Sequence, residues 1–151
     1  MMDAFFENID KDLQVSVFRN VEHTWPTHFH ANLEIFIVRH GKYEVTRNSE
    51  SFEMHDGSIA IFDNYDLHSY VNKDGTSDDC VIMIPADVSK AFDAARNGKR
   101  IKTTVIRDQK LTDTILDAID EMNLIPVGNG VADDKYYVDS VVNYVLCLLY
   151  K

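Results

Sequence analysis

The sequence is poor in cysteine, which excludes a fold stapled by disulfides. Its 151 residues include two cysteines, Cys80 and Cys147, too few for a disulfide framework and too far apart for a metal-binding pair. Cys80 opens an apolar run and Cys147 lies in an apolar helical pattern. Both are therefore predicted to be small core residues of a protein kept in a reducing compartment.

Basic residues are scarce as well. The 15 Lys and Arg residues are outnumbered by 25 Asp and Glu residues, which gives a net charge of −10. So acidic a surface repels phosphate backbones and anionic lipids. We therefore expect neither nucleic acid nor membrane to bind through this chain, and the simplest role of the charge is solubility.

A long hydrophobic run is also missing. The longest apolar stretch, residues 141–149, contains Asn143 and is too short to span a bilayer. Residues 1–10 lack the basic-then-apolar order of a signal peptide. These two absences predict a cytoplasmic protein.

The hydrophobic pattern changes along the chain, from the spacing typical of strands in the first part to the spacing typical of helices in the last part. Residues 31–39 are nearly continuous in apolar side chains, which is typical of a strand buried on both faces. Short strands at close spacing indicate a sandwich or barrel, so the fold class is mainly β with α. Strands are predicted at residues 13–19, 31–39, 42–47, 51–54, 58–63, 67–71 and 80–84, and helices at 87–96, 108–123 and 133–151. No helix-stop residue precedes Lys151, so either the native chain continues beyond it or a native terminal helix frays there.

The chemistry is concentrated around residue 30. His28, His30 and Glu34 share parity, so on one extended strand all three would point to the same face. Two imidazoles and a carboxylate are a partial shell for a divalent metal, and His68 is the candidate fourth ligand. Zinc, nickel, manganese and iron all suit such a shell. The alternative is a polar pocket lining or a hydrogen-bond network without metal.

The spacing resembles the two motifs of the cupin superfamily. The first motif has two histidines one residue apart, then a glutamate and a glycine, and these places hold His28, His30, Glu34 and Gly41. The second has a glycine, a histidine and an asparagine, and these places hold Gly57, His68 and Asn72. The resemblance implies a double-stranded β-helix, or jelly-roll barrel, followed by two to three C-terminal helices. It also implies that a bound ion would be held by His28, His30, Glu34 and His68.

Three positions depart from these motifs. Glu22 stands where the first motif opens with glycine, and Asp63 and Tyr65 replace a proline and a glycine of the second. The path of the loop leading to His68 is therefore in question.

The segment from residue 20 to 85 is similar, more narrowly, to the sensor domain of AraC-type transcription regulators. The similarity lies in the run from His28 to Gly41 and in the segments 43–45, 57–62 and 68–70. It implies a cupin ligand-binding core at residues 1–85 and a helical part of the same domain at 86–151. It further implies a small-molecule effector, a homodimer, and a DNA-binding helix-turn-helix domain that is absent from this chain.

Several aromatic residues are candidates for an effector pocket. Trp25 comes just before the motif and is a candidate lid over the pocket. Phe36, Tyr43 and Phe62 either line the pocket together with the four ligands or fill the barrel core. The Phe5-Phe6 pair is either an arm that folds over ligand, as in arabinose-responsive members, or a disordered tail. His23, His40 and His55 are expected at the surface.

The last predicted helix carries an apolar stripe. It packs against the barrel or forms a dimer seam, and the family resemblance favours dimerisation. The stripe consists of Val138, Val141, Val142, Val145 and Leu149.

Two functions follow from these observations. The first is a non-enzymatic sensing module that binds a metabolite such as a sugar. The second is a metal-dependent cupin enzyme of the dioxygenase or sugar isomerase type, with the ion as Lewis acid or oxygen activator. Glu44 and Glu53 are candidate bases only by proximity in sequence, so the sensing module is the preferred hypothesis.

Overall fold

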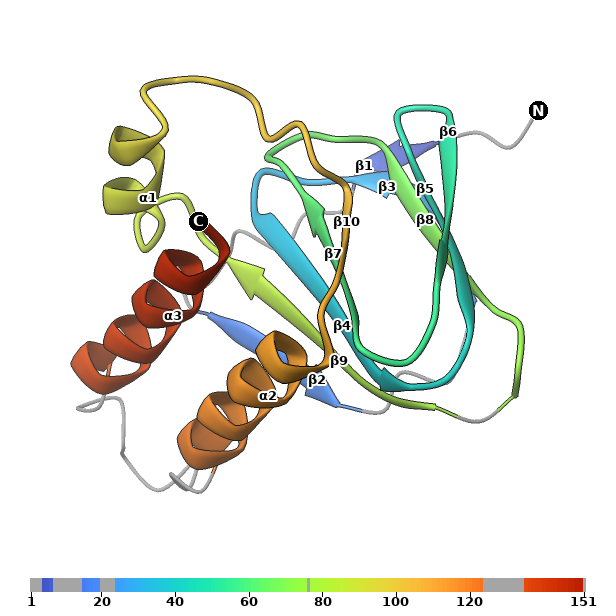
Figure 1. Cartoon of the computed structure of the whole chain (residues 1–151). Helices are drawn as coiled ribbons and strands as arrows, with labels where there is room; N and C mark the ends of the chain where they lie inside the picture. The colour runs from blue at the N-terminus through green and yellow to red at the C-terminus, as the bar shows by residue number, and fades with distance from the viewer. Residues whose placement is uncertain (1–3, 7–14, 20–23, 76, 124–134, 151) are drawn as a thin grey trace.

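The computed structural model describes residues 4–6, 15–19, 24–75, 77–123 and 135–150 (Figure 1). Two five-stranded sheets face each other, and three helices lie beside one of them. The mainly-β prediction with trailing helices is thereby confirmed.

The first sheet joins strands from both ends of the β-rich segment. Its β1 runs parallel to β3, and the other pairs are antiparallel. The strand order is β1 (Phe5–Phe6), β3 (Trp25–Phe29), β8 (His68–Asn72), β5 (Tyr43–Arg47) and β6 (Glu50–Met54).

The second sheet is antiparallel throughout. Its central strand, β4, is the apolar run of the sequence. The strand order is β10 (Val105–Arg107), β7 (Ser58–Phe62), β4 (Leu33–His40), β9 (Asp78–Ile84) and β2 (Ser16–Arg19).

Alternation along β4 divides the interior into two cores. Phe36 and Val38 point between the two sheets, into a core that contains Tyr43, Phe62 and Tyr70. Leu33, Ile35 and Ile37 point the other way, toward the helices. This explains why β4 has no polar face: both sides of its sheet are covered.

The helices cover the outer face of the second sheet (Figure 1). They are α1 (Lys90–Ala95), α2 (Gln109–Asn123) and α3 (Lys135–Tyr150). Ile115, Leu116 and Ile119 of α2 are fully buried in the helix-side core. No described helix is long and apolar enough to cross a membrane.

The apolar stripe of α3 faces this same core. Val142 and Val145 are buried in it, and Val138, Val141 and Leu149 pack against it partly buried. The stripe therefore serves as core within the protomer, and the helix's outer face is the one exposed to solvent.

Some predictions from the sequence were incomplete or wrong. The short strands β1, β3 and β10 were not predicted. Cys80 is buried as expected, but Cys147 is exposed, because it lies on the side of α3 away from the barrel. His40 and His55 are exposed as predicted. His23 lies outside the described residues.

Candidate functional site

The four predicted ligands come together, although not as one strand would place them. His28 is the last residue but one of β3 in the first sheet, Glu34 lies near the start of β4 in the second, and His30 occupies the connection between them. The single extended strand expected from the parity of these residues is therefore wrong. The chain turns at residues 30–32 and passes from the first sheet to the second. The side chains of His28, His30 and Glu34 all remain buried at this turn. His68 begins β8, directly opposite His28 in the antiparallel register.

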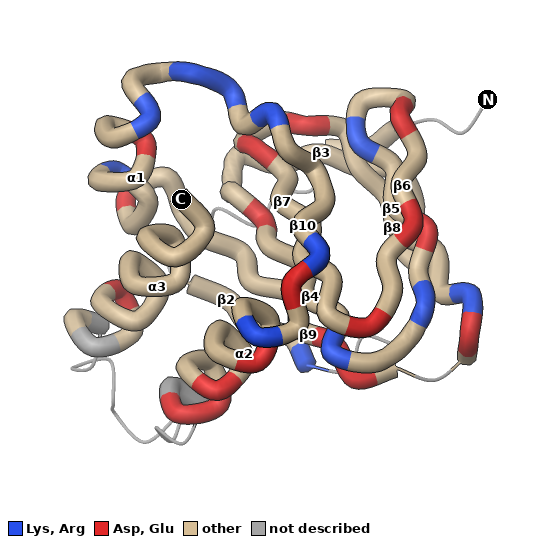
Figure 2. The backbone as a smooth tube through the Cα atoms, viewed as in Figure 1, with Lys and Arg blue, Asp and Glu red and all other residues tan. Residues whose placement is uncertain are grey.

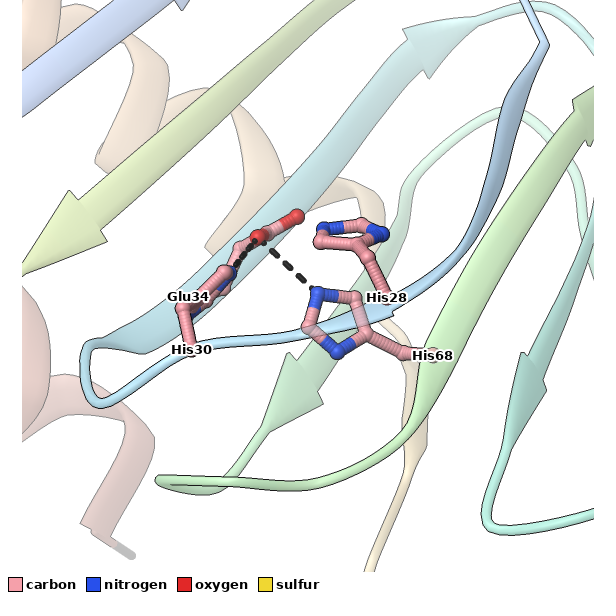
Figure 3. Close-up of side chains that lie close together, drawn as sticks. All are labelled: His28, His30, Glu34 and His68. Atoms are coloured by element: carbon pink, nitrogen blue, oxygen red, sulfur yellow. Dashed lines mark hydrogen bonds and ion pairs between the residues drawn. The ribbon is translucent and has the colours of Figure 1, made fainter. Parts of the chain in front are cut away.

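The ligand atoms of the four side chains lie within 4.8 Å of one another (Figure 3). Glu34 Oε2 is 2.8 Å from Nε2 of His30 and 3.1 Å from Nε2 of His68. All four residues are only 1% exposed. We call His28, His30, Glu34 and His68 the His/Glu cluster.

Each imidazole of the cluster is oriented by a backbone carbonyl two residues away. The Nδ1 atom of His28 lies 2.9 Å from the carbonyl oxygen of Pro26. The Nδ1 atom of His30 lies 3.0 Å from the carbonyl oxygen of Asn32. The Nδ1 atom of His68 lies 2.8 Å from the carbonyl oxygen of Asp66. A carbonyl only accepts, so Nδ1 must be the protonated nitrogen of each ring. In a neutral ring Nε2 then holds a lone pair, which is the tautomer that binds metal.

The charges of the cluster residues require a positive charge beside Glu34, either a proton or a metal ion. Burial alone would raise the pKa of Glu34, but the charge of His68 and hydrogen bonds with His30 and His68 lower it well below its usual range. Burial alone would lower the pKa of His68, but the Glu34 carboxylate raises it. Burial and the neighbouring His68 lower the pKa of His28 to about 4. Glu34 is thus an anion facing nitrogen lone pairs, and a proton or a metal ion must separate them.

The cluster also contains an unsatisfied oxygen. Glu34 Oε1 is buried and has no hydrogen-bond partner among the described residues. A buried carboxylate oxygen without a partner is costly. Three imidazole nitrogens and a carboxylate are a donor set that first-row divalent metals accept, so the residues fit an ion.

The loop leading to His68 brings that histidine into the cluster despite the departures in sequence. Tyr65, at the motif's glycine position, adopts a φ of 63°, in the left-handed region that glycine would occupy. Its backbone N–H donates to the carbonyl of His30 over 2.8 Å. Asp63, at the proline position, forms an ion pair with Arg96 that no local motif could have revealed.

The aromatic residues predicted to line a pocket lie mostly in the core. Phe36, Tyr43 and Phe62 are at most 1% exposed. Phe36 packs edge-on against Tyr43 at 4.8 Å between ring centroids, and Phe62 stacks on His68 at 4.4 Å. Trp25 is half-buried, with its ring edge-on to His28 at 6.2 Å.

Two contacts of the cluster go beyond what the sequence specifies, which leaves the Phe5-Phe6 pair open between an arm over ligand and a disordered tail. Phe5 of β1 stacks on the His28 ring at 5.7 Å between centroids, so the Phe5-Phe6 segment is a paired strand. The carbonyl of Asp66 orients His68. The Phe5 contact has no local signal, because it depends on which strand lies alongside β3, whereas the Asp66 contact is local, between residues two apart in the sequence.

Comparisons with known proteins support the fold. Residues 18–87 match the family model described as Cupin domain. A search of curated proteins finds no significant match. Among solved structures, the AraC-like transcriptional activator CuxR is 12% identical, with a TM-score of 0.54, over 91% of this chain and 47% of that one. ToxT from Vibrio cholerae is 11% identical, with a TM-score of 0.51, over 87% of this chain and 53% of that one. The chain spans about half the length of these two proteins.

Proposed function

We propose that this chain, built on a cupin domain at residues 18–87, is the effector-sensing part of an AraC-type transcription regulator. The observation that carries the proposal is the joint arrangement of barrel and helices. The likeness to CuxR extends over 91% of the chain and so takes in the helices as well as the cupin segment. Likeness at this identity concerns the fold, and the regulatory role is our inference from it.

The surface charge agrees with a sensor that leaves DNA binding to another domain. Acidic and basic residues are interspersed along the chain (Figure 2). No described helix carries a cluster of basic residues, and α2 holds Asp113, Asp117, Asp120 and Glu121 against one lysine, Lys110. A helix of this composition would be repelled by the phosphates beside the major groove.

The reading frame of the native gene tests this proposal. The frame should continue past the codon for Lys151 into a domain with two basic helix-turn-helix patterns. A stop codon at that position would overturn the regulator proposal and leave a free-standing binding protein or an enzyme.

For the His/Glu cluster we propose one divalent ion, with zinc, nickel, manganese and iron as candidates. The ion would resolve the lone-pair repulsion around Glu34 and satisfy its buried oxygen. Bound there, it would supply a Lewis acid and a fixed positive charge. Metal analysis and zinc titration of wild type and His30→Ala test this, with exposed His40→Ala as the matched control. Only His30→Ala should lose the ion, and equal zinc binding by all three proteins would contradict the proposal.

We place the effector, a small metabolite such as a sugar, at the cluster end of the barrel. Trp25 and Phe5 lie there against His28, and Trp25 is half-buried and so accessible to a ligand. Aromatic rings beside polar groups are the usual surroundings of a sugar ring.

An enzyme is the second candidate, favoured by the preformed N₃O cluster. A catalytic ion requires an open coordination position, yet all four ligands are only 1% exposed. The suggested bases point elsewhere: Glu44 faces Lys73 and Glu53 faces His55, on the outside of the sheet. If the metal-loaded chain turns over a substrate and His30→Ala abolishes that turnover, the enzyme becomes the preferred function.

We assign the homodimer to the outer face of α3. Tyr136 is 85% exposed and Tyr144 is 50% exposed, and Cys147 lies on the same face. Exposed aromatic residues at helical spacing are typical of a helix that packs against a partner.

A further inference from the structure

The loop at residues 63–67 holds two members of the His/Glu cluster in place. On its inner side, Tyr65 N–H donates to the carbonyl of His30 over 2.8 Å. Asn64 Nδ2 donates to the carbonyl of Ala31 over 2.6 Å. The carbonyl of Asp66 accepts from Nδ1 of His68 over 2.8 Å. The position of this loop therefore sets where two of the three ligand nitrogens point.

On its outer side, the loop is fixed by two buried carboxylates. Asp63 is 2% exposed and Asp66 is 1% exposed. Arg96 donates to Asp63 through its two terminal guanidinium nitrogens, Nη1 and Nη2, at 2.8 and 3.0 Å. Asp66 accepts from Nε of Arg47 over 2.6 Å and also from Arg100. Figure 2 shows the connection between α1 and β10 as a basic stretch lying over this part of the barrel.

Arg96 also belongs to the helical layer. It is the C-cap residue of α1 and binds Asp93 of that helix over 2.6 Å. Its guanidinium lies 5.3 Å from the ring centroid of Phe92. Phe92 in turn packs edge-on against Tyr150 of α3, whose hydroxyl donates to the carbonyl of Ala95 over 3.1 Å. A continuous set of contacts thus runs from His68 to the C-terminal turn of α3.

We propose that Arg96 is a positioning residue that, through Asp63, holds the loop at residues 63–67 in the geometry the His/Glu cluster needs and couples that cluster to α1 and the C-terminal turn of α3. The metal readout rests on the ion proposed above. The coupling is reciprocal: an ion that fixes the loop stabilises the contact of α1 with α3, and loosening α1 weakens ion binding by the same factor.

The chemistry of arginine makes this role specific. A guanidinium presents two parallel donors to both oxygens of Asp63, whereas a lysine ammonium offers the same charge at one point. Arg96→Lys therefore preserves charge while releasing the loop. Outer residues that orient metal ligands typically change metal affinity by roughly 10- to 100-fold when replaced.

The test compares wild type, Arg96→Lys and the control Arg39→Lys, with Co²⁺ as the probe ion. Arg39 forms ion pairs with Asp78 of β9 and with Asp113 and Asp117 of α2, all of which lie outside the loop. Visible absorption reports the Co²⁺ geometry, titration reports its affinity, and hydrogen exchange follows the amide of Tyr65 and residues 143–150. Far-UV circular dichroism confirms that each protein is folded.

Arg96→Lys should weaken Co²⁺ binding at least about tenfold, alter its visible spectrum, and speed exchange at both Tyr65 and residues 143–150. The control should match wild type. Affinity within twofold of wild type together with unchanged exchange would overturn the proposal. If Arg96→Lys fails to fold, Tyr150→Phe, which removes only the hydroxyl contact with Ala95, replaces it under the same criteria.

The metal-free proteins separate this proposal from the one on which it rests. If wild type takes up no Co²⁺, the ion proposal fails, while exchange in the metal-free proteins still decides the role of Arg96. Faster exchange at Tyr65 and residues 143–150 in Arg96→Lys alone upholds the positioning role. Equal exchange in all three proteins rejects it.

Discussion

Tyr65 is the residue where local backbone preference and the needs of the site conflict. It adopts a φ of 63° with its side chain 61% exposed. A non-glycine residue in that region costs roughly 1–2 kcal/mol, and an exposed side chain recovers little of this by packing. The conformation persists because the Tyr65 N–H is bonded to the His30 carbonyl, which ties the loop to the cluster.

Replacing Tyr65 should therefore change stability in opposite directions for two substitutions. Tyr65→Gly should raise the free energy of unfolding by about 0.5–1 kcal/mol because glycine adopts this φ without strain. Tyr65→Val should lower it by at least a similar amount because a β-branched residue is worse than tyrosine there. Urea denaturation measures both. If Tyr65→Val were as stable as Tyr65→Gly, the result would contradict the backbone strain assigned to Tyr65.

Gly57 and Gly75 form a natural matched pair. Both have positive φ, 75° and 74°. A Cβ on Gly57 would lie 3.0 Å from the Cα of Gln109, whereas a Cβ on Gly75 meets nothing within 4 Å. Gly57→Ala should therefore destabilise the protein clearly more than Gly75→Ala, since only the first also forces the start of α2 away from the β6–β7 turn. Equal losses in thermal unfolding would show that the backbone angle alone matters.

At the scale of elements, β4 is predicted well from sequence and the turn at the cluster is not. The apolar run at residues 31–39 indicated a strand covered on both faces, and its alternation between two cores confirms this. The parity of His28, His30 and Glu34 identified the right residues for the wrong reason. The chain bends at residues 30–32 and changes sheets, which depends on strand partners that no local pattern encodes. For the same reason β1 and β10, strands of two and three residues, escaped prediction.

The loop at residues 63–67 makes stability depend on acid in a defined way. Burial would raise the pKa of Asp63, but hydrogen bonds from Arg96 and the backbone hold it below its usual value. A carboxyl with a depressed folded-state pKa contributes stability above its unfolded pKa, about 3.9, and loses it as the pH falls through the folded value.

Asp63→Asn should therefore be less stable than wild type by about 3 kcal/mol at pH 7, because it removes the buried anion that Arg96 binds through two nitrogens and leaves Arg96 only the more exposed Asp93. The difference should shrink as the pH falls below about 4, because the unfolded wild-type chain then takes up a proton at Asp63 while the folded protein resists it until its lower pKa is reached. Urea unfolding of both proteins from pH 7 to pH 3 measures this. A difference that stays constant or grows toward acid would disprove the role assigned to the Asp63 charge.

At the scale of the whole molecule, α3 has two faces with different roles. Its inner stripe is core, so the dimer that we propose would use the outer face with Tyr136, Tyr144 and Cys147. The sequence alone could not decide whether the apolar stripe packs against the barrel or forms a dimer seam, because valine and leucine at helical spacing suit both roles.

Tyr144→Glu should accordingly shift the protein from dimer toward monomer, because it places a charge in the aromatic face of a chain that is already acidic. Light scattering after size exclusion distinguishes the monomer mass of 17.3 kDa from twice that value. Phe6→Glu is the control, since Phe6 is similarly exposed at 48% but lies on β1, across the barrel from the helices (Figure 1). Dissociation by Phe6→Glu but not by Tyr144→Glu would move the interface to β1.

The central claim is that the chain binds a small effector beside its His/Glu cluster, and thermal unfolding against a panel of sugars and related metabolites tests it most directly. A true effector at about 100 times its Kd adds about 2.7 kcal/mol, which corresponds to a rise in Tm of about 5–10 °C for a protein of this size. We expect such a rise with one class of compound in the zinc-loaded wild type, and its loss in Trp25→Ala. A panel that leaves Tm unchanged, or a rise that Trp25→Ala retains in full, would contradict effector binding at this end of the barrel.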